Sequence, residues 1–220
     1  DMFKDKLPGL VDILTAADVP GFNGFGIYPH IKDQPVFSEG KVRYRGETIL
    51  ALVGDRETIE NIQFEELPIK WHPLDAISGA AAALAPDAQA VHENIPDNVL
   101  TEGKLNKGGI AEGINAAAAI AEGELQTAFV EHAYIEPEAG YARRVGNRIE
   151  IVACTQAPAM DREECANILG VELDAVRIVP TACGGGFGGK LDVSLQPMLA
   201  VAAWKLERPV RAIFSRIESM

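Results

Sequence analysis

Gly184-Gly185-Gly186-Phe187-Gly188-Gly189-Lys190 places five glycines within seven residues, between an apolar run and a helical pattern. A backbone with so few Cβ atoms can adopt positive φ at several neighbouring positions and bring its N–H groups close to a ligand. The stretch therefore predicts a cradle for an anionic or polar cofactor. The alternative is a glycine-rich turn that only packs tightly, but turn geometry alone seldom uses so many glycines.

Two nucleotide-binding motifs share part of this pattern. Gly184, Gly189 and Lys190 satisfy G-x-x-x-x-G-K, but the next residue of a phosphate-binding loop is a Ser or Thr that binds Mg²⁺, and Leu191 has no hydroxyl. The loop also satisfies G-x-G-x-x-G, which requires an acidic residue roughly 20 positions further on, at the end of a second strand. Glu207 lies near that distance but belongs to a turn before a strand, so a dinucleotide site has weak support.

Composition restricts the kind of partner. The chain has 220 residues, 47% of them hydrophobic, and a formal net charge of −12. Nucleic acids and anionic membranes would repel such a chain, so we expect protein and small-molecule partners, no nucleic acid and no membrane. No apolar run approaches the ~18 residues of a membrane span, and the first residues lack the order of a signal peptide. We therefore expect a soluble, cytoplasmic protein.

The sequence predicts no metal site built from side chains. The three cysteines, Cys154, Cys165 and Cys183, form no C-x-x-C pair, and the four histidines form no H-x-x-H or H-E-x-x-H motif. Neither a zinc site nor an iron–sulfur cluster is expected in this chain. We interpret the cysteines as small buried apolar residues, and Cys183 is the one that could instead line a pocket beside the glycine loop.

Three segments follow from the pattern of apolar, glycine and proline residues. Residues 1–68 alternate short helical and strand patterns and predict a compact α+β unit. Residues 69–123 are rich in Ala, Pro and Asp and predict a connecting segment with short alanine-rich helices. Residues 124–220 predict a second α+β unit. The fold class expected for the chain is therefore α+β.

Several local elements are predicted. Leu10, Ile13 and Leu14 share one face of a helix, and Ser194 is placed to cap a helix that has Pro197 in its first turn. A further helix is expected over residues 157–169, ending at Gly170. The remaining patterns predict strands at residues 126–130, 133–135, 141–144, 148–153, 176–179 and 209–214.

Thr155-Gln156, the helix after them and the glycine loop together resemble the molybdenum-cofactor domain of the xanthine dehydrogenase and aldehyde oxidase family. Residues 7–21 are similar to a stretch of that family's α/β hammerhead domain. Further stretches agree in order and spacing: Val42 to Glu47, Glu131 to Glu138, Arg208 to Val210, and Ser215 to Glu218. By this resemblance the chain is part of a molybdopterin-binding large subunit, with an N-terminally incomplete hammerhead domain at 1–68 and the start of the cofactor domain at 124–220.

The resemblance implies a molybdopterin cofactor whose dithiolene sulfurs hold the molybdenum, which agrees with the lack of a side-chain metal motif. It leaves open whether a cytosine dinucleotide extends the pterin. Gln156 corresponds to a glutamine whose amide hydrogen-bonds an oxo ligand of molybdenum. Gly185, Gly186, Phe187 and Gly188 correspond to loop residues that contact the cofactor, mainly through backbone groups.

The resemblance also implies a reaction, the hydroxylation of an N-heterocycle or aldehyde with water as the oxygen source. Electrons would pass to iron–sulfur clusters and FAD on partner subunits or domains. Purine-oxidising members carry a glutamate after the G-G-K, where this chain has Leu191, so Leu191 is a candidate substrate-pocket residue and purine recognition is in doubt.

No catalytic residue is assigned. The family's catalytic base lies downstream of the stretches matched here, so we expect the chain alone to be an incomplete, inactive fragment that works with the remainder of its subunit. Glu131, Glu136 and Glu138 lie close to the cofactor motif, but they are expected to be solvated strand residues. The alternative function is a non-catalytic assembly or structural module of such a complex.

Overall fold

The computed structural model describes residues 3–220, which divide into two compact units. One unit comprises the chain up to Trp71 together with Glu131–Met220, and the other comprises His72–Val130. We keep the division at residues 1–68, 69–123 and 124–220 as a proposal about the domains of the complete protein.

The larger sheet of the first unit has the strand order β5-β4-β3-β6. Strands β3 (Ala139–Val145) and β4 (Arg148–Ala153) form a hairpin, and β6 (Val210–Ile213) pairs antiparallel with β3. Strand β5 (Val176–Pro180) runs parallel to β4. The strands predicted at 141–144, 148–153, 176–179 and 209–214 are therefore confirmed.

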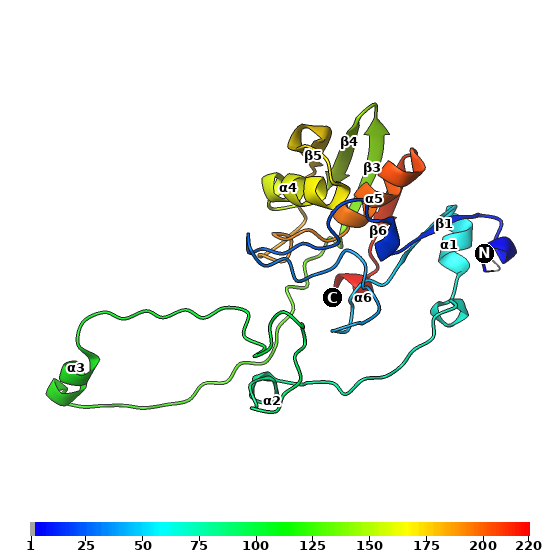
Figure 1. Ribbon diagram of the computed structural model, residues 1–220. Helices are drawn as coiled ribbons and strands as arrows, with labels where there is room; N and C mark the ends of the chain where they lie inside the picture. The colour runs from blue at the N-terminus through cyan, green and yellow to red at the C-terminus, as the bar shows by residue number, and fades with distance from the viewer. Residues whose placement is uncertain (1–2) are drawn as a thin grey trace. The chain divides into compact units, whose positions relative to one another are not determined.

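Two helices cover one face of this sheet (Figure 1). Helix α4 (Pro158–Leu169) connects β4 to β5, and its end at Gly170, where φ is +64°, confirms the predicted left-handed C-terminus. Helix α5 (Gln196–Leu206) packs against α4, β3 and β4. The core between helices and sheet is aliphatic and includes Ile149, Ile151, Ile168, Leu195, Leu199 and Val201.

The predicted helix cap at Ser194 is wrong. The residue at the N-cap of α5 is Leu195, and the Ser194 hydroxyl donates to Oε1 of Gln196 at 3.1 Å. The Gln196 amide in turn donates to Asp161 on α4 at 3.1 Å. Ser194 therefore orients a side chain that joins the first turns of two helices.

The smaller sheet contains β1 (Leu10–Leu14) paired antiparallel with β2 (Ala51–Gly54). The helix predicted from Leu10, Ile13 and Leu14 is thus wrong. Leu10 and Leu14 are the two buried residues of β1, and the pairing shifts register between Leu10 and Asp12. Residues four apart share one face in a strand as well as in a helix, so the spacing of Leu10 and Leu14 does not distinguish the two, and the irregular pairing further disturbs the alternation of the strand.

The remaining helices are short. Helix α1 (Arg56–Asn61) follows β2, and α6 (Arg216–Ser219) lies near the C-terminus. One-turn 3₁₀ segments occur at Lys4–Lys6, Ala16–Asp18, Phe64–Glu66 and Leu173–Ala175. Across residues 3–220, no helix has both the length and the apolar character to cross a membrane.

The second unit holds α2 (Ala80–Ala83) and α3 (Ile110–Ala116), two short helices of the kind predicted for the connecting segment. The strand predicted at 126–130 is absent there, and the one predicted at 133–135 is absent from the first unit. Phe129 and Ile135 are at least 90% exposed, and Ala133 has a φ of +48°. An apolar run forms a strand only where a partner strand accepts its hydrogen bonds, and no strand of the described chain pairs with either run.

Candidate functional site

The candidate site lies where β4 and β5 end. Because these strands are parallel, their carboxyl ends share one edge of the sheet, which is where ligands bind in many sheets of this kind. Gln156 follows β4 and the glycine loop follows β5. The topology therefore brings together the amide and the loop that the sequence predicted as one site.

Gln156 is bound to the loop through three hydrogen bonds. Its Oε1 accepts from the N–H of Gly188 at 3.1 Å and from the N–H of Lys190 at 3.2 Å. Its own N–H donates to the Lys190 carbonyl at 2.9 Å. Both partners of the Gln156 side chain are backbone N–H donors, so the amide oxygen, which is its acceptor, must face the loop. The Nε2 donor then points away from it, at an exposed residue, with no partner among residues 3–220.

The loop requires glycine for two reasons. A Cβ on Gly186 would lie 2.4 Å from the Gln156 Oε1, and a Cβ on Gly189 would lie 2.9 Å from the Tyr134 ring. Gly185 and Gly188 instead have φ values of +102° and +97°, which side chains rarely tolerate. Close approach and backbone conformation therefore both select glycine.

The loop presents donors rather than side-chain ligands. The N–H groups of Gly185, Gly186 and Phe187 make no hydrogen bond within residues 3–220, whereas that of Gly188 is used by Gln156. Neighbouring unpaired N–H groups form a concave site for anionic groups. In the described chain, no three His, Cys, Asp or Glu side chains gather as a metal site. The unpaired N–H groups suit an anionic or polar ligand.

Two apolar side chains lie beside these donors, Phe187 within the loop and Leu191 directly after it. Phe187 has a φ of +51° and is 75% exposed, so its ring is displayed outward. Leu191 is 38% exposed and donates its N–H to the Gly188 carbonyl at 3.3 Å. Both apolar side chains are thus accessible beside the loop.

Two sequence expectations near the loop are wrong. Cys183 is exposed and donates to the Gly185 carbonyl at 3.2 Å, whereas Cys154 and Cys165 are buried as expected. Glu138 is not solvated but buried, and it accepts a hydrogen bond from the Tyr134 hydroxyl. Burial and this contact raise the pKa of Tyr134, which keeps the phenol neutral.

The structure gives a place in the site to residues to which the sequence assigned no role, including Glu136, which was expected to be solvated. Lys190, Glu136 and Tyr134 meet directly beneath the loop, and Lys190 is 2% exposed. The one signal in the sequence is the lysine that ends the glycine run, and by itself that lysine points only to the phosphate-binding motif.

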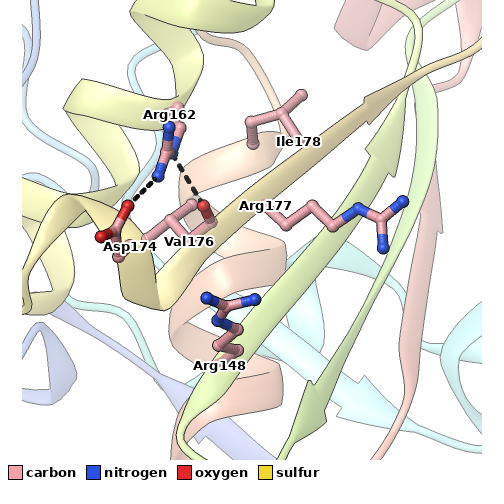
Figure 2. A pocket seen from close by; sticks show the side chains of 6 residues that line it. All are labelled: Arg148, Arg162, Asp174, Val176, Arg177 and Ile178. Atoms are coloured by element: carbon pink, nitrogen blue, oxygen red, sulfur yellow. Dashed lines mark hydrogen bonds and ion pairs between the residues drawn. The ribbon is translucent and has the colours of Figure 1, made fainter.

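A separate basic depression lies at the opposite edge of the sheet (Figure 2). Arg148 begins β4 and Val176 begins β5, so the depression is at the amino ends of the parallel pair. The Arg162 guanidinium, also in its wall, is held by Asp174 at 2.8 Å and by the Val176 carbonyl at 2.9 Å (Figure 2). It does not belong to the candidate site.

Comparison with known proteins gives a family match over the site. Residues 91–220 match the family model described as a molybdopterin cofactor-binding domain. Among relatives, the chain is 34% identical over 217 residues to a probable xanthine dehydrogenase subunit of Bacillus subtilis, covering 98% of this chain and 29% of that protein. It is 32% identical over 222 residues to the nicotinate dehydrogenase large molybdopterin subunit of Eubacterium barkeri, covering 100% of this chain and 51% of that protein.

Solved structures agree. The aldehyde oxidoreductase from Desulfovibrio gigas superposes with a TM-score of 0.86 at 27% identity, over 95% of this chain and 24% of that one. The predicted α+β fold of a molybdenum hydroxylase is thereby confirmed. The chain spans about 29% of one curated relative and about half of the other.

Proposed function

Because the chain belongs to the molybdopterin-binding family of xanthine dehydrogenases and aldehyde oxidoreductases, we propose that its glycine loop and Gln156 hold part of a molybdenum–pterin cofactor in a larger oxidoreductase. The observation that carries this proposal is the orientation of Gln156. Two loop N–H groups donate hydrogen bonds to its Oε1, which leaves Nε2 as an outward donor beside three unpaired backbone N–H groups.

These residues suit the cofactor in charge and in geometry. The N–H groups of Gly185, Gly186 and Phe187 would bind its anionic or polar atoms, and Gly188 would act by shaping the backbone around Gln156. The Gln156 Nε2 would donate toward the ligands of the metal, where a hydrogen bond tunes the metal's electronics. Because these donors are fixed before binding, little reorganisation is needed.

When bound, the cofactor supplies a two-electron oxidation that places an oxygen atom from water on a carbon of the substrate. N-heterocycles and aldehydes are the proposed substrate classes, since the relatives are named for xanthine, nicotinate and aldehyde. Iron–sulfur clusters and FAD on partner subunits or domains would accept the electrons. The cytosine dinucleotide form of the pterin is a further candidate for the same site.

Leu191 is the proposed contact to the substrate. It follows the loop directly and has an accessible apolar side chain. An apolar group offers no hydrogen bond to a purine, so this position would favour a less polar ring or aldehyde.

The test distinguishes the role of the Gln156 amide nitrogen from that of its amide oxygen. In the complete protein, Gln156→Glu keeps an oxygen for the Gly188 and Lys190 N–H groups but removes the outward donor. We expect molybdenum to be retained and kcat to fall on the order of tenfold to a few hundredfold, with a smaller change in KM. Gln156→Ala removes both the oxygen and the nitrogen of the amide, and the kcat of this variant should fall at least as far.

Gln126→Ala is the matched control, since Gln126 is an exposed glutamine that belongs to the other compact unit. Molybdenum content and steady-state rates are measured on the same preparations. Full metal and full rate in both Gln156 variants would show that Gln156 is only a polar residue after a strand.

A further inference from the structure

Lys190 is a buried lysine at the base of the glycine loop. Its ammonium donates to the Glu136 carbonyl at 2.8 Å and to the Glu136 carboxylate at 3.0 Å. It also lies 4.4 Å from the centroid of the Tyr134 ring. Lysine is almost never fully buried unless paired, and these contacts, together with an interaction with Cys154, compensate for the lost hydration of the ammonium.

Glu136 connects this charge to the other end of the loop. The same carboxylate oxygen that accepts from Lys190 accepts from the Gly184 N–H at 2.6 Å, and the Glu136 N–H donates to the Gly184 carbonyl at 3.3 Å. Burial alone would raise the pKa of Glu136, but the Gly184 and Lys190 hydrogen bonds outweigh it and lower the pKa. The carboxylate is therefore ionised at neutral pH and joins the first and last residues of the loop.

The Lys190 backbone holds the glutamine at the same time. Its N–H donates to the Gln156 side chain and its carbonyl accepts from the Gln156 N–H. We infer that Lys190 is a positioning residue, whose ammonium closes the base of the loop on Glu136 so that Gln156 and the free N–H groups face the cofactor before it binds. The ordering of the loop stands on these contacts alone, and its consequence for the cofactor rests on the proposed function.

The decisive variant is Lys190→Met, which keeps the length of the side chain and removes the ammonium. The readout is amide hydrogen exchange of a peptide that contains residues 184–190, in the complete protein, together with molybdenum and pterin content. We expect exchange of this peptide to be faster by on the order of tenfold, and cofactor content to fall, because the loop must then be ordered on binding.

Lys205→Met is the matched control. Lys205 lies on α5, and its ammonium pairs with Asp12 at 2.8 Å and with Asp18 at 2.7 Å rather than with any residue of the loop. Loss of these two ion pairs should leave the exchange of the loop peptide and the cofactor content unchanged. Should Lys190→Met fail to fold, Glu136→Gln gives a second route, since it keeps an acceptor for Gly184 and loses only the charge on a partly exposed side chain.

Loop exchange and cofactor content together test the positioning role of Lys190 separately from the proposed function. Unchanged loop exchange in Lys190→Met and Glu136→Gln overturns the positioning role, and so does a loosened loop that still loads full cofactor. Wild-type protein that lacks molybdenum and pterin overturns the proposed function instead. In that case faster exchange in Lys190→Met still supports the closure of the loop by Lys190.

Discussion

Gly186 shows how a single hydrogen atom in place of a side chain sets the geometry of the site. A Cβ there would meet the Oε1 of Gln156 at 2.4 Å and its Cδ at 2.6 Å. Gly186 is not among the residues with positive φ, so alanine would not strain the backbone. The only group that must move is the flexible end of Gln156, which makes this position a selective probe of the amide.

We predict that Gly186→Ala leaves the fold intact but displaces Gln156, which releases the Gly188 and Lys190 N–H groups. The rate of the complete enzyme should fall on the order of tenfold or more, as for loss of the amide itself. Gly103→Ala is the control, because a Cβ there meets nothing within 4 Å and no positive φ is involved. Equal steady-state rates in the two variants would show that Gln156 need not occupy its observed position.

A second prediction at this scale concerns Leu191. Leu191→Glu should leave cofactor content unchanged and shift the ratio of kcat/KM values toward purine-like heterocycles, by on the order of tenfold or more if the carboxylate meets the ring. The measurement is kcat/KM for a purine and for an aldehyde on one preparation. An unchanged ratio would place Leu191 outside the substrate pocket.

The residues of the site are predictable to different degrees. The proximity of Gln156 and the glycine loop follows from their order around a β-α-β unit, since both come after parallel strands. The Lys190–Glu136 pair is not predictable, because it joins residues 54 positions apart through tertiary packing. The outward ring of Phe187 likewise depends on a positive φ that its residue type disfavours.

At the scale of elements, periodicity predicts structure well where an element is long and paired. Helix α4 and the β3–β4 hairpin have regular patterns, and their positions agree with the sequence prediction. Strand β1 also fits a helical pattern because residues four apart, such as the buried Leu10 and Leu14, share one face in both kinds of element. Whether an apolar run such as 126–130 becomes a strand depends on a partner elsewhere in the chain, and local sequence does not contain that information.

Helix α4 carries a buried carboxyl group that makes stability depend on pH. Burial raises the pKa of Asp161 to about 6 from an ordinary 3.8, against hydrogen bonds from Thr155 and Gln196 that lower it. Between these two values the folded state holds a proton that the unfolded state has released. The contribution of Asp161 to the free energy of unfolding therefore falls as pH rises from 3.8 to about 6.

We predict that Asp161→Asn, which cannot ionise, gains Tm relative to wild type as pH rises from about 4 to about 6, and that the difference then levels off. The gain should not appear in Asp87→Asn, where the aspartate is exposed. Thermal unfolding across this pH range is the measurement. A Tm difference that does not change with pH would mean that Asp161 titrates normally.

In the compact unit that contains both sheets, a partly buried ion pair joins the N-terminal segment to α4. The Lys32 ammonium donates to the Glu164 carboxylate and, at 2.6 Å, to the Gly26 carbonyl. Glu164 is 3% exposed. Removing the lysine would leave a buried carboxylate without its counter-ion, which is costly in a site of low polarity.

Lys32→Met should therefore lower the stability of this unit by about 3–5 kcal/mol. Arg56→Met provides the comparison, since both members of the Arg56–Glu60 pair are exposed and such pairs contribute at most about 1 kcal/mol. Denaturant unfolding measures both. Similar small losses in the two variants would show that Glu164 is compensated by another group when Lys32 is absent.

The central claim is that this chain forms part of a molybdenum–pterin site. The most direct test is the molybdenum and pterin content of the complete protein, purified after expression with its maturation machinery. We predict both in stoichiometric amounts and in a constant ratio to protein. A fully matured, folded preparation that contains neither molybdenum nor pterin would contradict the claim.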